Sequence, residues 1–180
     1  MKKRLTKELS KIRGNPIVLT ILPKEDYHDL NMHIVKLITK KSPKGAYVSL
    51  NKPYYSLVES MSKNKIKHNN FLFIDCIGRE ELKGVENCIF LKSPESLTNI
   101  AIALDRSYRD KEHGFIFLDS IDTLSVYHDP KLLIKFVRST IERIRETNKL
   151  GMMIGLHQGT DPQILSEISA VCDKVINLKK

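Results

Sequence analysis

Residues 114–124, GFIFLDSIDTL, place acidic side chains directly after an apolar run. Asp119 follows four large apolar residues, and Ser120 and Asp122 come next. A carboxylate in this position is how many nucleotide-hydrolysing proteins hold Mg²⁺. The segment allows three roles for these side chains: capping of the turn and helix that follow the strand, a residual metal or nucleotide contact, or a polar contact with a partner protein.

Other residue types that commonly carry catalysis form no recognisable site in the sequence. No serine lies in a Gly-x-Ser-x-Gly turn, and no activating base is evident for Cys76. Five histidines lack the spacing of metal ligands, so a zinc site is not expected: His28, His33, His68, His113 and His128. The three cysteines are widely spaced within apolar runs, which predicts core residues: Cys76, Cys88 and Cys172. We therefore assign no catalytic residue and no metal ligand.

Seven apolar runs of strand length alternate with segments of helical period. The predicted strands are 16–22, 46–50, 71–77, 88–91, 115–119, 152–156 and 174–178. Nearly continuous apolar runs are typical of parallel strands that are covered on both faces. Helices are predicted to begin at Ser93-Pro94, Asp129-Pro130 and Asp161-Pro162, where a capping residue precedes proline. The pattern predicts a doubly wound, mainly parallel α/β sheet with ligands at the carboxyl ends of its strands.

The order of these elements resembles the RecA-like ATPase core, most closely its KaiC-like branch in archaea and bacteria and related uncharacterised archaeal families. Three segments carry the resemblance: FIFLDS (115–120), GLHQG (155–159) and AVCDKVINL (170–178). It implies a three-layer α/β/α fold of the P-loop NTPase class. It also implies that Asp119 and Ser120 stand where the magnesium-associated aspartate lies, and that His157 and Gln158 stand near a sensor position, with a structural loop contact as the alternative.

Two segments depart from the pattern of that family. Where the family has the phosphate-binding loop G-x-x-x-x-G-K-[ST], this chain has LPKEDYHDLNMHI (22–34), which contains no glycine. Lys24 is accompanied there by three acids, Glu25, Asp26 and Asp29, which would repel phosphate. The second strand ends at Asn51 and Lys52, where the family places a water-activating glutamate. These departures predict a degenerate Walker A segment.

Residues 1–13 carry six basic residues against the single acid Glu8: Lys2, Lys3, Arg4, Lys7, Lys11 and Arg13. Leu5, Leu9 and Ile12 recur at helical spacing, so the segment is predicted to be a basic amphipathic helix. Its basic residues could contact nucleic acid, acidic lipid or a partner; alternatively, its apolar residues dock on the domain. We expect residues 14–180 to form a single RecA-like domain.

At 41% hydrophobic and 28% charged residues, the composition is that of an ordinary globular protein. No apolar run is long enough for a membrane span and no secretory signal is evident, which predicts a cytoplasmic protein. The leading hypothesis is a pseudo-ATPase that acts as an interaction or regulatory module, through a protein partner or self-association, without a cofactor. The alternatives are a divergent ATPase that uses ATP and Mg²⁺ with Lys24, and a nucleic-acid-binding accessory protein that uses the basic amino terminus.

Overall fold

A computed structural model describes residues 1–78 and 84–179 of the chain. The central sheet has seven strands: β1 (Ile17–Leu22), β2 (Gly45–Ser49), β3 (Phe71–Asp75), β4 (Cys88–Phe90), β5 (Phe115–Asp119), β6 (Leu150–Leu156) and β7 (Lys174–Asn177). Their order is β4-β3-β2-β5-β6-β1-β7, and every neighbouring pair is parallel. The seven predicted strands and the parallel sheet are confirmed, with ends that differ by up to two residues.

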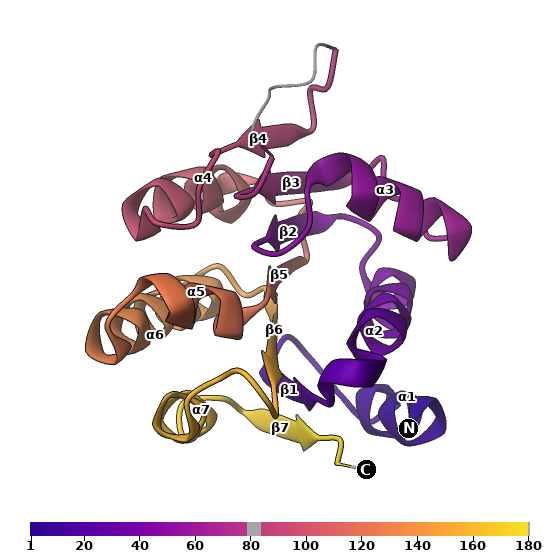
Figure 1. The fold of residues 1–180 in the computed structure, drawn as a ribbon. Helices are drawn as coiled ribbons and strands as arrows, with labels where there is room; N and C mark the ends of the chain where they lie inside the picture. The colour runs from indigo at the N-terminus through magenta and orange to yellow at the C-terminus, as the bar shows by residue number, and fades with distance from the viewer. Residues whose placement is uncertain (79–83, 180) are drawn as a thin grey trace.

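Helices cover both faces of the sheet, which gives the predicted three-layer α/β/α arrangement (Figure 1). One face is covered by α1 (Lys2–Ser10), α2 (Tyr27–Lys41) and α3 (Tyr54–Lys63). The other is covered by α4 (Leu97–Arg109), α5 (Ile121–Tyr127), α6 (Pro130–Glu146) and α7 (Pro162–Ser169). A 3₁₀ turn, η1 (Lys24–Asp26), joins β1 to α2. Among the described residues, no helix has the length and apolar character that crossing a bilayer requires.

Two of the three predicted helix starts are confirmed in detail. The side chains of Asp129 and Asp161 accept hydrogen bonds from backbone N–H groups in the first turns of α6 and α7. The third prediction is wrong by one turn, because Ser96 and not Ser93 caps α4. Ser93 instead accepts from the N–H of Glu95 in the preceding loop, a local turn that serine side chains also stabilise.

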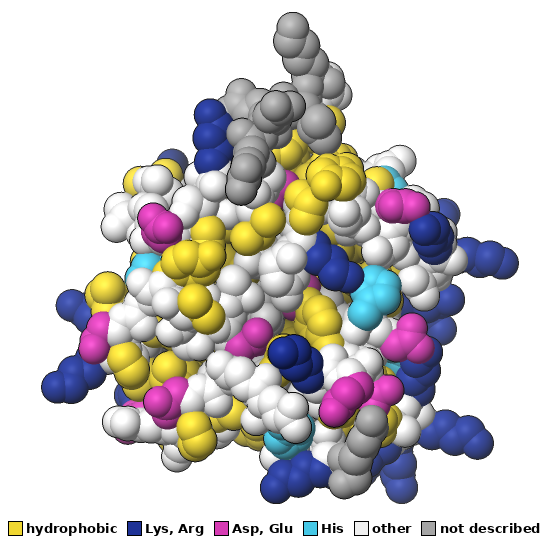
Figure 2. Space-filling model, viewed as in Figure 1, with side chains coloured by type: hydrophobic (Ala, Val, Ile, Leu, Met, Phe, Trp, Pro, Cys, Tyr) yellow, Lys and Arg dark blue, Asp and Glu magenta, His cyan; other side chains and the backbone are white. Residues whose placement is uncertain are grey.

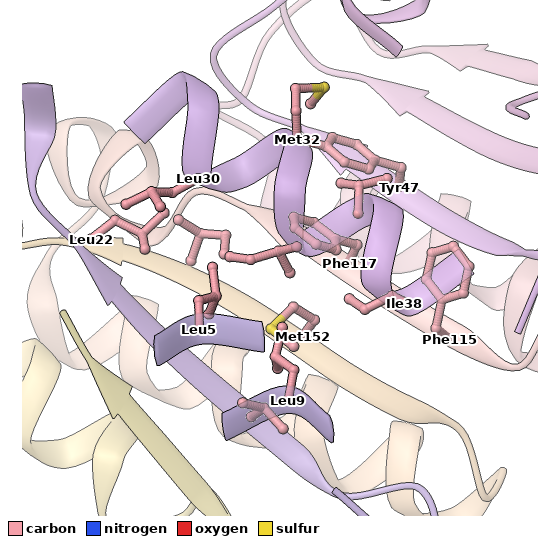
Figure 3. Packing of buried hydrophobic residues seen from close by; sticks show 14 of the residues in the cluster. Leu5, Leu9, Leu22, Leu30, Met32, Ile38, Tyr47, Phe115, Phe117 and Met152 are labelled. Carbon is pink, nitrogen blue, oxygen red and sulfur yellow. The ribbon is translucent and has the colours of Figure 1, made fainter. Parts of the chain in front are cut away.

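The core on the α1–α3 face contains the apolar residues of the amino-terminal helix. The helix predicted over residues 1–13 ends at Ser10, and Ile12 lies just after it. Leu5, Leu9 and Ile12 are buried, and Figure 3 shows Leu5 and Leu9 close to Met152 of β6. Polar contacts also hold the amino-terminal segment on α2: the Lys41 ammonium donates to the carbonyl of Ile12, and the Thr6 hydroxyl of α1 contacts a ring nitrogen of His33. In this structure α1 is docked on the domain through its apolar residues.

All three cysteines are free thiols in this fold. Cys76 is buried, and Cys88 and Cys172 are partly buried. Burial raises the pKa of Cys88 and of Cys172 to about 12, so both remain neutral thiols at physiological pH. They behave as the small apolar side chains that the sequence predicts.

Candidate functional site at the carboxyl end of the sheet

Asp119 is the last residue of β5 and is 1% exposed. Its Oδ1 accepts a hydrogen bond of 2.5 Å from the Tyr27 hydroxyl. Its Oδ2 accepts one of 2.8 Å from the Asn31 side-chain amide and another from the Tyr47 hydroxyl. A buried carboxylate must be paired or hydrogen-bonded, and three protein donors meet that requirement here.

Local structure explains how the three donors converge. Tyr27 and Asn31 are one helical turn apart on α2, so their side chains share the face that looks onto the sheet. Tyr47 of β2 is in register with Phe117, and their rings stack with centroids 4.8 Å apart. Because side chains alternate along a strand, Phe117 and Asp119 lie on the same face of β5. The Tyr47 hydroxyl therefore reaches the carboxylate two residues beyond its own partner.

The pKa shifts of Asp119, Tyr27 and Tyr47 agree with the direction of their hydrogen bonds. Burial raises the pKa of Asp119, and the hydrogen bonds from Tyr27, Tyr47 and Asn31 oppose that rise. Burial, and then the negative charge of Asp119, raise the pKa of Tyr27 and of Tyr47. Both phenols therefore keep their protons and donate to the carboxylate.

A second layer of polar side chains fixes Tyr27. Asn51, just after β2, donates from its amide to the Tyr27 hydroxyl at 2.8 Å and lies 3.4 Å from the Ser120 hydroxyl. Asn51 thus orients the residue that covers Asp119, in the place where the family resemblance implies a water-activating glutamate.

The neighbouring Lys52 contacts a different residue of α2. Its Nζ lies 2.6 Å from Nδ1 of His28, and burial lowers the pKa of both side chains.

The connection between β1 and α2 is short and bonded within itself. Pro23 has no N–H group, the N–H of Asp26 bonds to the Pro23 carbonyl, and the N–H of Tyr27 bonds to the Lys24 carbonyl. An anion-binding loop needs several backbone N–H groups that converge on open space. In this turn the N–H groups of Asp26 and Tyr27 are already engaged within the turn.

Lys24 and Gln158 lie at a separate recess from Asp119. Both are exposed and, with His157, line a pocket of about 250 Å³ at the ends of β1 and β6. Its lining does not include Asp119 or Ser120. Nε2 of His157 is buried without a hydrogen-bond partner among the described residues. Of the residues that the sequence suggests for a nucleotide site, Asp119 and Ser120 are thus buried, whereas Lys24, His157 and Gln158 line an open recess.

The helix-capping role expected for Asp119 and Ser120 is wrong. Ser120 precedes α5, but its side chain makes no capping hydrogen bond, and the Asp119 carboxylate points to α2 and β2. Asp122 lies in the first turn of α5, where burial raises the pKa of its carboxyl group. Asp119 has a structural role, but it links elements that are distant in sequence.

Metal-binding capacity at this edge is limited. Asn31, Asn51 and Asp122 each keep one buried side-chain oxygen for which the described residues supply no donor. Oxygen atoms of this kind accept a hydrogen bond from buried water or coordinate a hard cation. Within residues 1–78 and 84–179, however, no three His, Cys, Asp or Glu side chains are grouped as metal ligands.

Tyr27, Asn31 and Tyr47 are not among the site residues that the sequence predicts. One available signal was the spacing of Tyr27 and Asn31, which puts two polar side chains on a single helix face directly after the first strand. Another was the hydroxyl of Tyr47 inside an otherwise apolar strand, since buried tyrosines usually find a hydrogen-bond partner.

The basic amino-terminal residues remain at the surface while their helix is docked. Lys2, Lys3, Arg4, Lys7, Lys11 and Arg13 are all exposed. Lys2 pairs with Asp29 at 2.9 Å and Lys11 with Glu8 at 3.3 Å. Part of the positive charge of residues 1–13 is therefore compensated by neighbouring carboxylates.

A comparison of the sequence with known protein families identifies one match. The sequence model of a family described as a family of unknown function (DUF7504) matches residues 80–178, which is more than half of the chain. No curated protein sequence matches.

Two solved structures are similar in fold. The KaiC-like protein PH0186 from the hyperthermophilic archaeon Pyrococcus horikoshii OT3 is 12% identical, with a TM-score of 0.65 over 94% of this chain and 75% of that one. The flagellar accessory protein FlaH from Methanocaldococcus jannaschii is 14% identical, with a TM-score of 0.63 over 97% and 76%. The likeness confirms the predicted RecA-like, KaiC-like fold.

Proposed function

Because this chain belongs to the family of unknown function DUF7504 and has a RecA-like fold, we propose that it is a pseudo-ATPase domain. In this role it binds no nucleotide and acts as an interaction or regulatory module, with a protein partner or a second copy of itself. Neither ATP nor Mg²⁺ is required for its function.

The observation that carries the proposal is the hydrogen bonding of Asp119. A Mg²⁺ ion needs lone pairs that point at it, in near-octahedral geometry and with several waters. Here both carboxylate oxygens face protein donors, and Tyr27 stands in contact with Oδ1. The residues around Asp119 therefore do not fit a magnesium site, and we derive no catalytic step through that ion.

The β1–α2 connection supports the same proposal. Phosphate binding in this fold class depends on a glycine-rich loop whose N–H groups wrap the anion. The turn at Lys24–Asp26 has no glycine and adds two carboxylates beside the single Lys24 ammonium. The same turn leads into Tyr27, so the segment that would hold phosphate delivers the residue that covers Asp119.

The second candidate is a divergent nucleotide-binding ATPase, and the open recess at Lys24 favours it. Lys24, His157, Gln158 and Lys179 offer donors for an anion at this recess. Lys24 also lies close enough to lower the pKa of Asp122 by its charge. This candidate predicts nucleotide binding that depends on Lys24, which the pseudo-ATPase proposal excludes.

Thermal melting in the presence of nucleotide separates the two candidates. We expect the melting temperature of the wild-type chain to be the same in EDTA, in Mg²⁺, in Mn²⁺ and in magnesium-ATP. A ligand at 100 times its dissociation constant would stabilise the fold by about 2.7 kcal/mol, which melting detects readily. A rise of several degrees in magnesium-ATP that Lys24→Ala abolishes would establish the divergent ATPase instead.

A further inference from the structure

Positive charge is concentrated in the part of the chain that builds one face of the molecule. Residues 1–70 contain 15 Lys and Arg and 5 Asp and Glu, a formal charge of +10. Residues 71–180 contain 15 and 16, a formal charge of −1. The first 70 residues supply α1, α2 and α3, which cover a single face of the sheet, and Figure 2 shows many Lys and Arg side chains along that side.

Four lysines on this face line one surface pocket of about 250 Å³. Lys36 and Lys40 are one turn apart on α2, and Lys65 and Lys67 lie in the loop that follows α3. All four are exposed. None of them forms a salt bridge with a carboxylate of the described residues, whereas Lys2, Lys11 and Lys63 on the same face each do. We refer to these four residues as the lysine pocket.

The charges of the lysine pocket and of the basic helix α1 both affect one side chain of α2, His33. His33 of α2 contacts Thr6 of α1, and its pKa is lowered first by burial and then by the positive charges of Lys2, Lys36 and Lys40. Charges from α1 and from the lysine pocket thus reach the same side chain. The positive surface therefore extends across α2 from one group of lysines to the other.

We propose that this face binds the phosphate backbone of double-stranded nucleic acid, with the lysine pocket as its centre and the basic residues of α1 at its edge. The Lys36 ammonium donates to the carbonyl of Asn64, but none of the four ammonium groups is neutralised by a carboxylate of the described residues. Clustered ammonium groups of this kind bind phosphates by releasing the counterions that surround a duplex. Unlike the interpretation based on residues 1–13 alone, this surface includes α2 and the loop after α3. It is independent of the Asp119 cluster, which lies inside the fold.

The side chains that line the pocket favour a duplex over other polyanions. Single strands are usually held by aromatic rings that stack on the bases, and the pocket lining contains no aromatic residue. Membrane surfaces are usually bound with apolar anchors as well as charge, and the apolar lining here consists of Pro43 and the buried Ile66. A rigid duplex presents its phosphates at a fixed spacing, so the ammonium groups of the lysine pocket can bind it without aromatic or apolar contacts.

Binding to a short, fluorescently labelled duplex DNA of mixed sequence tests the proposal. In the pocket variant, Lys36, Lys40, Lys65 and Lys67 are changed to Gln. In the control variant, the same change is made at four exposed lysines outside the α1–α3 face, Lys92, Lys111, Lys131 and Lys135. Like the lysines of the pocket, they form no salt bridge with a carboxylate of the described residues. Each set contains one lysine with a positive φ, Lys65 or Lys92, and each lowers the formal charge equally.

We expect fluorescence anisotropy to show duplex binding by the wild type that weakens steeply between about 50 and 200 mM salt. The pocket variant should bind about tenfold or more weakly, and its slope of log affinity against log salt should be shallower by about 3 to 4. The control variant should retain most of the affinity and the slope. A third variant with Arg at the four pocket positions should bind like the wild type, because the charges are kept.

Three results would overturn the proposal. The first is an equal loss of affinity in the pocket and control variants, which would indicate a general effect of net charge. The second is no duplex binding by the wild type at about 50 mM salt, where phosphate contacts are strong. The third is pocket-dependent binding to vesicles of phosphatidylserine and phosphatidylcholine without binding to the duplex, which would assign this face to membranes.

Discussion

Changing Asp119 to Ala is expected to lower the free energy of unfolding by about 4 kcal/mol. The change leaves the hydroxyls of Tyr27 and Tyr47 and the amide of Asn31 without their acceptor in a buried site. Each buried donor left without a partner costs about 1–3 kcal/mol, and removal of the side chain adds a small cavity. Urea denaturation followed by circular dichroism measures the difference.

Asp119→Asn is the matched control for this experiment, since it keeps the size of the side chain and one acceptor oxygen. We expect it to lose about half as much stability as Asp119→Ala, because one hydrogen bond is replaced by an amide facing other donors. If Asp119→Ala costs less than about 1 kcal/mol, as an exposed substitution does, the carboxylate does not hold α2 to the sheet.

Changing Leu5 to Ala is expected to cost about 3 kcal/mol of unfolding free energy. Leu5 is fully buried and belongs to the same apolar core as Leu22, Leu30 and Met152, near which Figure 3 places it. Leu-to-Ala changes in such positions cost about 2–5 kcal/mol, because they lose transfer free energy and leave a cavity. The same denaturation experiment measures it.

Lys3→Ala provides the control on the same helix, because Lys3 is exposed. Its effect should stay within about 0.5 kcal/mol. Equal, small effects of both changes would mean that α1 does not dock on the domain in solution, and would leave all of its residues available to a partner.

The strands were predictable because burial on both faces requires uninterrupted apolar runs, which are visible in the sequence. Asp119 was identifiable for a related reason, since a carboxylate directly after such a run is conspicuous. Its environment was not predictable in the same way. The hydrogen bonds from Tyr27 and Tyr47 join residues 92 and 72 positions apart, and tyrosines next to apolar residues resemble core side chains in a sequence.

The basic surface likewise has one part that is visible in a short stretch of sequence and one part that forms only in the folded chain. Residues 1–13 are conspicuous in the sequence because their six basic residues lie within one short segment. The lysine pocket combines two pairs of lysines from segments about thirty residues apart, and neither pair is conspicuous alone. Only the packing of α2 beside the loop after α3 brings them to one pocket.

Titration calorimetry with magnesium-ATP at about 1 mM, the upper end of ordinary Michaelis constants, tests the central claim most directly. The hydrogen-bonded Asp119 and the closed turn at Lys24–Asp26 predict no saturable heat and no phosphate release above a buffer blank. A saturable isotherm accompanied by ATP hydrolysis, both abolished in a folded Lys24→Ala variant, would contradict the account and identify the chain as an active ATPase.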